Sequence, residues 1–388
     1  MTRDIYISGA AMTKFGRHDA VPMPSLAQEA ILGALADAGL GLDDPQAFYC
    51  ANVYGGMILG QTLVRDLGLS GMPMYNVENA CASGATGIHL ARHALLAGIY
   101  DTVVVFGVEK LTQLGGGSIP LQRNDYKTDL YAAQGMTLPA IYAMRATRYL
   151  HETGHAPEVL GQVAVKNRRH GALNPLSQAR NEVSLEEVMN SRKVYDPLTL
   201  LQCCPSTVDG AAAVVLTTKR PSAGSSATRR PDVRVRASVV QSGKREEGLE
   251  DILDAEITAR AAHLAFEQAG LGPDDLGVIE LHDAFTIAEL LYYEAFGLCG
   301  RGEGPRLLAD GVTALGGRVP VNPSGGLIAK GHPLGATGVA QMVEVVWQLQ
   351  GRAEGRQIEG AKVGLTQCTG GGIAGVDHAA SAVHILTV

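Results

Sequence analysis

The chain has 388 residues, 46% of them apolar, so it can bury a large core in two or three structural units. Its formal net charge of −7, without a block of five like charges, argues against a nucleic-acid partner. The longest apolar stretch, 94–108, is broken by Asp101, and the first residues lack the apolar core of a signal peptide, so we expect no membrane association. Six dispersed cysteines predict free thiols in a reducing, cytoplasmic environment.

The first half of the chain alternates between helix and strand patterns. In chain order we expect a helix over 26–38, a helix over 84–97, a strand over 102–108 and a final strand over 211–217. Gly39 takes the C′ position that ends the first helix. Cys81 follows a strand-like run and stands at the start of the second helix, where a helix dipole and a nearby imidazole would lower the pKa of its thiol.

The stretch between Leu111 and Pro205 breaks this alternation with polar turns, a helix around 140–151 and several basic residues. We interpret residues 112–205 as a loop domain inserted before the last strand of the first half. Residues 221–231, rich in Ser, Ala and Arg, are interpreted as a linker. The expected units are therefore an N-terminal half, the insertion, the linker and a C-terminal half, at 1–111 with 206–220, 112–205, 221–231 and 232–388.

The second half repeats the first in order. Residues 34–44 are echoed by 265–275, and the sequence Gly-Ala-Thr-Gly at 84–87 recurs at 335–338. The corresponding predicted elements are helices over 257–269 and 335–349 and strands over 362–366 and 380–386. Such a repeat predicts an α/β protein built twice from one ancestral unit, with a mostly parallel sheet covered by helices on both faces.

Three glycine-rich segments carry the chemistry. Cys81 lies in Asn-Ala-Cys-Ala-Ser-Gly-Ala-Thr-Gly, His332 in Gly-His-Pro-Leu-Gly-Ala-Thr-Gly, and Cys368 in Gln-Cys-Thr-Gly-Gly-Gly. A thiol activated by an imidazole attacks thioesters, and a second thiol can move a proton next to a carbonyl. Together they suggest acyl transfer through a thioester.

These motifs, taken in order, resemble those of the thiolase superfamily over essentially the whole chain. His282-Asp283-Ala284-Phe285 stands where degradative and biosynthetic thiolases carry Asn-Glu-Ala-Phe. The closer resemblance is therefore to sterol-carrier-protein-type thiolases and their bacterial and archaeal relatives, with an HDAF motif. The resemblance implies the thiolase fold, two repeated βαβαβαββ halves in a five-layered α-β-α-β-α core.

The resemblance also implies roles for particular residues. Cys81 would be the nucleophile, with His332 taking its proton, and Cys368 the base that removes a proton α to the second thioester. His282 and His332 would hydrogen-bond the enolate oxygen, and backbone N–H groups near Cys81 and in 370–372, including Gly370 and Gly371, the acyl-enzyme carbonyl. Residues expected to contact coenzyme A are Met136, Arg169, Ser206, Ser324 and Gly325, with Lys166 and Arg168 as further candidates for its phosphates.

Coenzyme A thioesters are expected as substrates, without a permanently bound cofactor or metal. The resemblance implies a homodimer or homotetramer, with a small OB-fold partner as a possibility. His151-Glu152-Thr153-Gly154-His155 matches the HExxH pattern of zinc proteases, but Gly154 and Pro157 predict that the helix ends between the histidines. Two other functions stay open: another carbon–carbon reaction, such as ketone acylation or retro-aldol cleavage, and a non-catalytic acyl-CoA or lipid-binding module.

Overall fold

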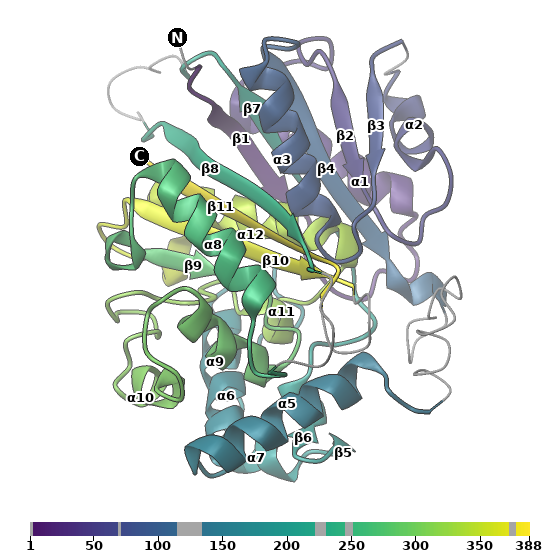
Figure 1. Ribbon diagram of the computed structural model, residues 1–388. Coiled ribbons are helices and arrows are strands. Elements are labelled where there is room, and N and C mark those ends of the chain that lie inside the picture. Colours follow the sequence, from purple (N-terminus) through teal and green to yellow (C-terminus); the bar gives the residue numbers. More distant parts are fainter. Residues whose placement is uncertain (1–2, 69–70, 115–133, 222–229, 245–250, 372–377) are drawn as a thin grey trace.

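The computed structural model describes residues 3–68, 71–114, 134–221, 230–244, 251–371 and 378–388 (Figure 1). The strands are β1 (Tyr6–Met12), β2 (Phe48–Ala51), β3 (Met74–Val77), β4 (Thr102–Lys110), β5 (Lys193–Tyr195), β6 (Leu198–Thr199), β7 (Asp209–Thr217), β8 (Val233–Ser242), β9 (Val278–Glu280), β10 (Val363–Gly370) and β11 (Ala380–Thr387). The helices are α1 (Met23–Ala38), α2 (Leu59–Val64), α3 (Ser83–Leu96), α5 (Leu138–Thr153), α6 (Glu158–Ala172), α7 (Leu185–Asn190), α8 (Glu256–Ala269), α9 (Thr286–Ala295), α10 (Gly304–Ala309), α11 (Gly326–Ala329) and α12 (Leu334–Leu349).

The strand order confirms that the chain is built from two similar halves. The large sheet runs β3-β2-β4-β7-β1-β8-β11-β10-β9. Outward from the central β1–β8 pair, the first half continues with β7, β4 and β2, and the second half with β11, β10 and β9. In each half the last strand in the sequence lies next to the central pair, and β2 and β9 run parallel to β4 and β10. Gly39 and Gly270, at equivalent positions, both end a helix with φ of 68°. The repeat seen in the sequence is thus a repeat of structure.

The halves form the five layers of the expected fold. Helix α1 packs on one face of β1, β4 and β7, and α8 packs on the outer face of β8 and β11 (Figure 1). Helices α3 and α12 contact each other and lie between the strands of the two halves. The strand β4 is buried along its whole length, as its run of β-branched and aromatic residues predicts.

The prediction of a mostly parallel sheet is wrong. Among the described strands, β2 pairs in parallel with β3 and β4, and β9 with β10. The central pairs β4–β7, β7–β1, β1–β8, β8–β11 and β11–β10 are antiparallel. The alternation of helix and strand holds only within each half. The last strand of each half instead lies antiparallel to its neighbour from the same half, β7 to β4 and β11 to β10.

The elements between β4 and β7 occupy the lower part of Figure 1, where α5, α6 and α7 lie with the β5–β6 hairpin below the second half. From this topology we propose that residues 112–205 form an insertion. Residues 1–111 with 206–220 would then form one repeated half, and residues 232–388 the other. Most of the predicted linker, 222–229, and residues 115–133 of the predicted insertion lie outside the described residues. None of the helices in the described ranges has the length and apolar character needed to cross a bilayer.

Candidate active site

The Cys81 loop is a tight junction between β3 and α3. Ala80, the residue before the cysteine, has φ of 48°, a left-handed conformation that costs a non-glycine residue of order 1 kcal/mol or more. Buried Ser83 holds the turn, because its hydroxyl accepts from the Asn79 N–H at 2.8 Å and donates to the Ala80 carbonyl at 2.5 Å. Cys81 is thereby fixed directly before the first turn of the helix.

The repeated Gly-Ala-Thr-Gly sequences explain why the two halves bring their functional residues together. A Cβ atom on Gly84 would lie 2.8 Å from the Gly335 carbonyl oxygen, and one on Gly338 would lie 2.4 Å from the Ala85 nitrogen. Only glycine therefore allows the first turns of α3 and α12 to approach this closely. Since Cys81 precedes Gly84 by three residues and His332 precedes Gly335 by three, the contact places thiol and imidazole side by side.

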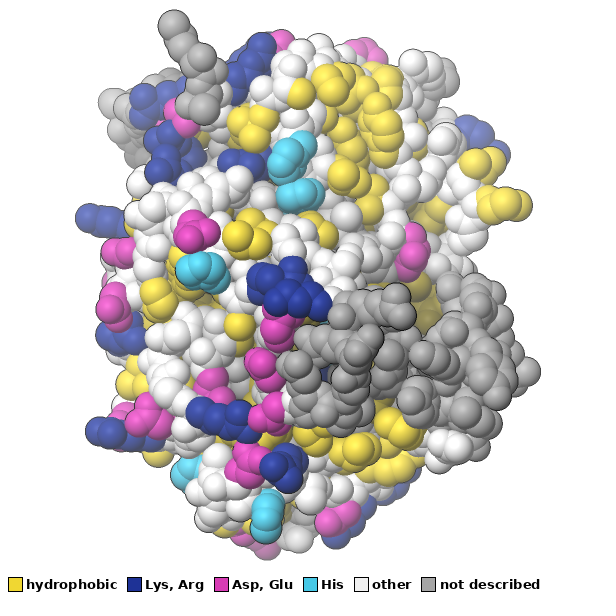
Figure 2. All heavy atoms as spheres, viewed as in Figure 1, with side chains coloured by type: hydrophobic (Ala, Val, Ile, Leu, Met, Phe, Trp, Pro, Cys, Tyr) yellow, Lys and Arg dark blue, Asp and Glu magenta, His cyan; other side chains and the backbone are white. Residues whose placement is uncertain are grey.

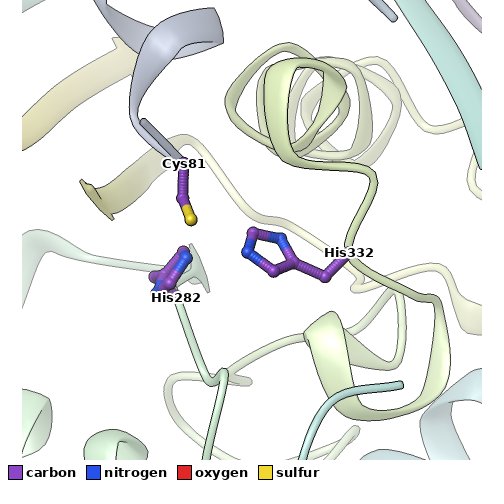
Figure 3. A group of neighbouring side chains, drawn as sticks. All are labelled: Cys81, His282 and His332. Carbon is purple, nitrogen blue, oxygen red and sulfur yellow. The ribbon is translucent and has the colours of Figure 1, made fainter. Parts of the chain in front are cut away.

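Cys81, His282 and His332 converge on one point (Figure 3). The Cys81 sulfur and one nitrogen from each imidazole all lie within 4.8 Å of one another. The two rings are 4.9 Å apart between centroids and nearly perpendicular. His282 reaches this point from the loop after β9 and His332 from the loop before α12, and both are only 5% exposed.

The hydrogen bonds of His332 determine which of its nitrogens carries the proton. Nδ1 lies 2.8 Å from the Thr337 hydroxyl, and that hydroxyl donates its only proton to the Pro333 carbonyl at 3.1 Å. We therefore assign the proton to Nδ1, which donates to Thr337. The opposite nitrogen, Nε2, is left with a free lone pair, as a proton acceptor requires.

The C-terminal cysteine motif closes the site from the other side. Fully buried Cys368 lies on β10, and its thiol contacts the Cys81 carbonyl oxygen at 3.0 Å. A Cβ on Gly370 would lie 2.2 Å from the Asn79 carbonyl oxygen, so this strand end can pass the cysteine loop only as glycine. The N–H of Gly371 bonds to the Cys81 sulfur. The predicted loop extends to Gly372, which lies outside the described residues.

The electrostatics differ from the expected activated thiol. Loss of solvent raises the pKa of Cys81 to about 12, and the carboxyl of Glu109 adds to this, against the lowering effect of the Gly371 N–H. Burial also holds the pKa of His332 well below its ordinary value and lowers that of His282 to about 4. The expectation of a depressed Cys81 pKa is therefore wrong for the free enzyme, because desolvation outweighs the helix dipole. The resting pair is a neutral thiol and a neutral imidazole.

The residues expected to contact coenzyme A differ in their exposure. Ser206 is exposed, Met136 is half-buried just before α5, and the exposed Arg169 lies 3.8 Å from Glu182. Ser324 is fully buried, and its hydroxyl donates to the Glu280 carboxylate at 2.7 Å. This geometry does not favour a ligand contact for Ser324.

Gly325 adopts φ of 98°, and a Cβ on it would lie 2.7 Å from Gly171, so packing accounts for this glycine. Lys166 is buried against Glu289 at 2.5 Å. Arg168 donates to the Asn181 side chain at 2.6 Å. The structure thus places both basic side chains within the protein, away from the exposed position that a phosphate contact needs. The Cys203–Cys204 segment, by contrast, pairs with Ala284 and Phe285 beside the site.

The HExxH pattern behaves as predicted. Helix α5 ends at Thr153, Gly154 has φ of 69°, and His155 turns away to the Gly302 carbonyl at 3.1 Å. Among the described residues, the group with metal-ligand geometry is instead Cys81, His282 and His332. A thiolate and two imidazoles are ligands that zinc accepts.

Sequence reasoning missed a buried carboxyl at the end of β4. The Glu109 side chain is fully buried and accepts hydrogen bonds from the backbone N–H groups of Val53, Tyr54 and Gly335 and from the Asn52 amide. Burial raises its pKa to about 7 despite these four donors. Glu109 therefore ties the first half to the start of α12. The sequence feature that could have identified Glu109 is an acidic residue directly after the apolar residues of a predicted strand.

Comparisons with known proteins cover both halves. Residues 5–220 match the N-terminal domain of thiolases, and residues 240–386 match the thiolase C-terminal domain-like family. Benzoylsuccinyl-CoA thiolase subunit BbsB of Thauera aromatica is 42% identical over 96% of each chain. An acetyl-CoA acetyltransferase of Methanothermobacter thermautotrophicus is 40% identical over 99% of this chain and 100% of its own. Human sterol carrier protein 2 is 37% identical over 94% of this chain and 69% of its own.

Solved structures agree. An Ltp2-ChsH2(DUF35) aldolase matches with a TM-score of 0.84 and 26% identity, covering 100% of this chain and 98% of that chain. Human mitochondrial 3-ketoacyl-CoA thiolase matches with a TM-score of 0.71, covering 99% of both chains, and at 18% identity it shows the fold alone. The chain therefore belongs to the thiolase family, and its activity is that of a thiolase-type acyl-CoA acyltransferase.

Proposed function

We propose that the chain catalyses reversible thiolysis of a 3-ketoacyl-CoA, and the reverse Claisen condensation, with Cys81 as nucleophile. The convergence of one thiol and two imidazoles within 4.8 Å carries this proposal. In thiolysis the Cys81 S–H proton passes to Nε2 of His332 while the sulfur bonds to the 3-keto carbon. The bond between C2 and C3 then breaks, leaving the shortened acyl group on Cys81 and the enolate of acetyl-CoA, which keeps C1, C2 and the original coenzyme A.

Cys368 is proposed to exchange the proton of that enolate. Burial first, and then the neighbouring Cys81, raise the pKa of its thiol well above the ordinary value, so it is protonated at rest. A protonated thiol suits the cleavage direction, in which it donates to the enolate carbon. The resulting thiolate then takes the proton of the incoming coenzyme A thiol, whose sulfur attacks the acyl-enzyme. Condensation runs the same steps backwards.

Two oxyanion sites support these steps. The Gly371 N–H, which already bonds to the Cys81 sulfur, is proposed to serve the acyl-enzyme carbonyl with other N–H groups of the Cys81 and Gly370 segments. The enolate oxygen is assigned to His282 and His332. Once Nε2 of His332 has accepted the thiol proton, it can donate a hydrogen bond to the enolate oxygen.

For the coenzyme A moiety we propose contacts from the exposed Ser206 and Arg169 and from Met136, with the Cys203–Cys204 segment lining the pantetheine path. The thioester is the substrate, and no permanently bound cofactor is needed for the steps above. A place in lipid metabolism fits the resemblance to sterol carrier protein 2. The free cysteines fit the cytoplasm.

We also propose a homodimer or homotetramer. The edge strand β3 and helix α3 expose Tyr75 and Leu90, and Figure 2 shows apolar side chains gathered on this upper part of the surface. Elsewhere on that view acidic and basic side chains are interspersed, without a broad cationic area. Light scattering that finds a monomer at micromolar concentration would contradict this proposal.

A second candidate function is another carbon–carbon reaction with a small OB-fold partner subunit. Two observations favour it: the relative from Thauera is named as a subunit, and the aldolase of similar structure contains a second protein in its name. The buried HDAF segment, with His in place of Asn, changes the donor on the enolate side. Ketone acylation or retro-aldol cleavage would use that altered side.

The deciding experiment is a panel of straight-chain, branched, aromatic and steroid 3-ketoacyl-CoAs, assayed for thiolysis by the absorbance of their magnesium complexes. Wild type is expected to cleave at least one of them, and Cys81→Ala to abolish cleavage. Iodoacetamide labelling of Cys81 that acyl-CoA blocks, without turnover of any substrate, would instead favour the partner-dependent reaction. A non-catalytic binding module would bind acyl-CoA and form no acyl-enzyme.

A further inference from the structure

One nitrogen of His282 has no partner among the described residues. Nε2 is buried, receives no hydrogen bond, and points to the Cys81 sulfur (Figure 3). The other nitrogen, Nδ1, lies 3.1 Å from the Thr369 hydroxyl. A buried unpaired nitrogen is costly unless a ligand completes it, so this atom is directed at the reacting group.

Behind His282 runs a chain of hydroxyl groups. The Thr369 hydroxyl lies 3.2 Å from the Tyr292 hydroxyl on α9. Tyr292 bonds in turn to Tyr142 on α5, and the Tyr142 hydroxyl lies 2.7 Å from Nε2 of His378. Tyr142 also stacks on Phe285 of the HDAF segment, with ring centroids 4.4 Å apart. The inserted segment that carries α5 is thereby connected to the enolate side of the site.

Each hydroxyl in this chain has one proton to give but can accept from both neighbours, so the bond between Thr369 and His282 is the one whose direction decides the tautomer. In the first direction Tyr142 donates to Tyr292, Tyr292 to Thr369 and Thr369 to Nδ1 of His282, and in the second Nδ1–H of His282 donates to Thr369. The first direction leaves Nε2–H facing the site, and the second leaves a bare lone pair there. Nε2 of His332 already presents a bare lone pair at the same point, and two facing lone pairs in a desolvated site repel each other.

We propose that the Tyr142–Tyr292–Thr369 relay holds His282 as the Nε2–H tautomer, which makes Thr369 and Tyr292 positioning residues for the group that binds the enolate oxygen. This inference rests on the proposed function. It assigns opposite tasks to two adjacent imidazoles: Thr337 keeps His332 an acceptor, whereas Thr369 keeps His282 a donor.

The direct test is ¹⁵N NMR of the full-length protein labelled in its histidine rings. The His282 signals are identified by their loss in a His282→Asn variant. The expected result for free wild type is a protonated Nε2 and a bare Nδ1 that accepts a hydrogen bond. A protonated Nδ1 would overturn the proposal. This measurement is made on the wild-type protein, so it does not depend on whether variants of Thr369 or Tyr292 fold.

The functional test compares Thr369→Val with Thr369→Ser. Enolate formation is measured as deuterium exchange at the α-carbon of acetyl-CoA, and acylation of Cys81 by mass spectrometry. Thr369→Val should lose about tenfold to hundredfold in exchange but keep acylation within about threefold, because the nucleophile and its base do not use the relay. Thr369→Ser restores the hydroxyl and should recover most of the loss.

Thr366→Val is the matched control, because Thr366 lies on the same strand, is 1% exposed, and its hydroxyl has no partner among the described residues. It should leave exchange unchanged. Equal exchange in wild type and Thr369→Val, or an equal loss in Thr366→Val, would refute the relay. Failure of the proposed function is distinguishable, because wild type itself would then show neither exchange nor acylation.

Discussion

The pH dependence of Cys81 alkylation tests the electrostatics of the site. The pKa of this thiol is about 12 instead of 9.0, so the thiolate fraction at pH 8 is about 10⁻⁴ instead of about 10⁻¹. A more basic thiolate is more nucleophilic, with a Brønsted slope of about 0.4–0.5, which recovers roughly a factor of 20 of the thousandfold loss. Iodoacetamide should therefore modify Cys81 roughly 50-fold more slowly than an unperturbed thiol.

The shape of the profile is more diagnostic than the rate. Because the pKa is raised, the thiolate fraction keeps growing through the accessible range, and the alkylation rate should rise about tenfold per pH unit from pH 7 to 10. Mass spectrometry of the Cys81 peptide after timed quenching gives the rate at each pH. A plateau below pH 9 would show a thiol ionised in the free enzyme and would refute this reasoning.

Acylation by substrate should behave differently, because His332 removes the thiol proton during attack. His332→Asn keeps a side chain of similar shape and removes the base. We expect acyl-enzyme formation to slow by about 10²–10⁴-fold, while alkylation at pH 9 changes less than tenfold. Equal losses in both reactions would mean that His332 supports the loop rather than the proton transfer.

Further predictions concern the supports of the site. Glu109→Gln turns an amide N–H toward a backbone donor, so it should cost about 1–3 kcal/mol in chemical unfolding, and unchanged stability would contradict the buried four-donor geometry. Gly370→Ala places a methyl group against the Asn79 carbonyl and should abolish acylation. Gly41→Ala should not, because a Cβ there would meet only the Asp44 carboxylate, at an ordinary contact distance of 3.6 Å.

The sequence was sufficient for the parts of the fold that depend on local pattern. Helical spacing and a terminal glycine located α1 and α8, and the echoed sequences identified the repeat. Strand direction was not predictable in the same way, because an antiparallel return and a parallel crossover have the same period of two. Helix α6 was also missed, since its buried Lys166 is compensated by Glu289, a partner more than a hundred residues away.

The four expected catalytic side chains, of Cys81, His282, His332 and Cys368, lie together. Each stands in a motif that can be recognised in the sequence, and glycines in these motifs allow the segments to approach closely. The pKa of Cys81 was predicted in the wrong direction. A sequence shows that a cysteine begins a helix, which lowers its pKa, but not how completely the opposite half removes solvent from it. Desolvation is a property of the assembled halves, and here it is the larger effect.

The repeated Gly-Ala-Thr-Gly sequence therefore sets how closely the two helices approach, and the residues that precede it carry the reacting groups. Both copies of Gly-Ala-Thr-Gly begin a helix, and each allows the other to approach. Three residues before them the copies differ, with a thiol in one half and an imidazole in the other. Neither half alone could make the acyl-enzyme, because the proton donor and the acceptor come from different halves. Widening the contact should test this: Gly338→Ala, which would press on Ala85, is expected to slow acylation without changing either reacting group, and normal acylation would show that close approach of the helices is not required.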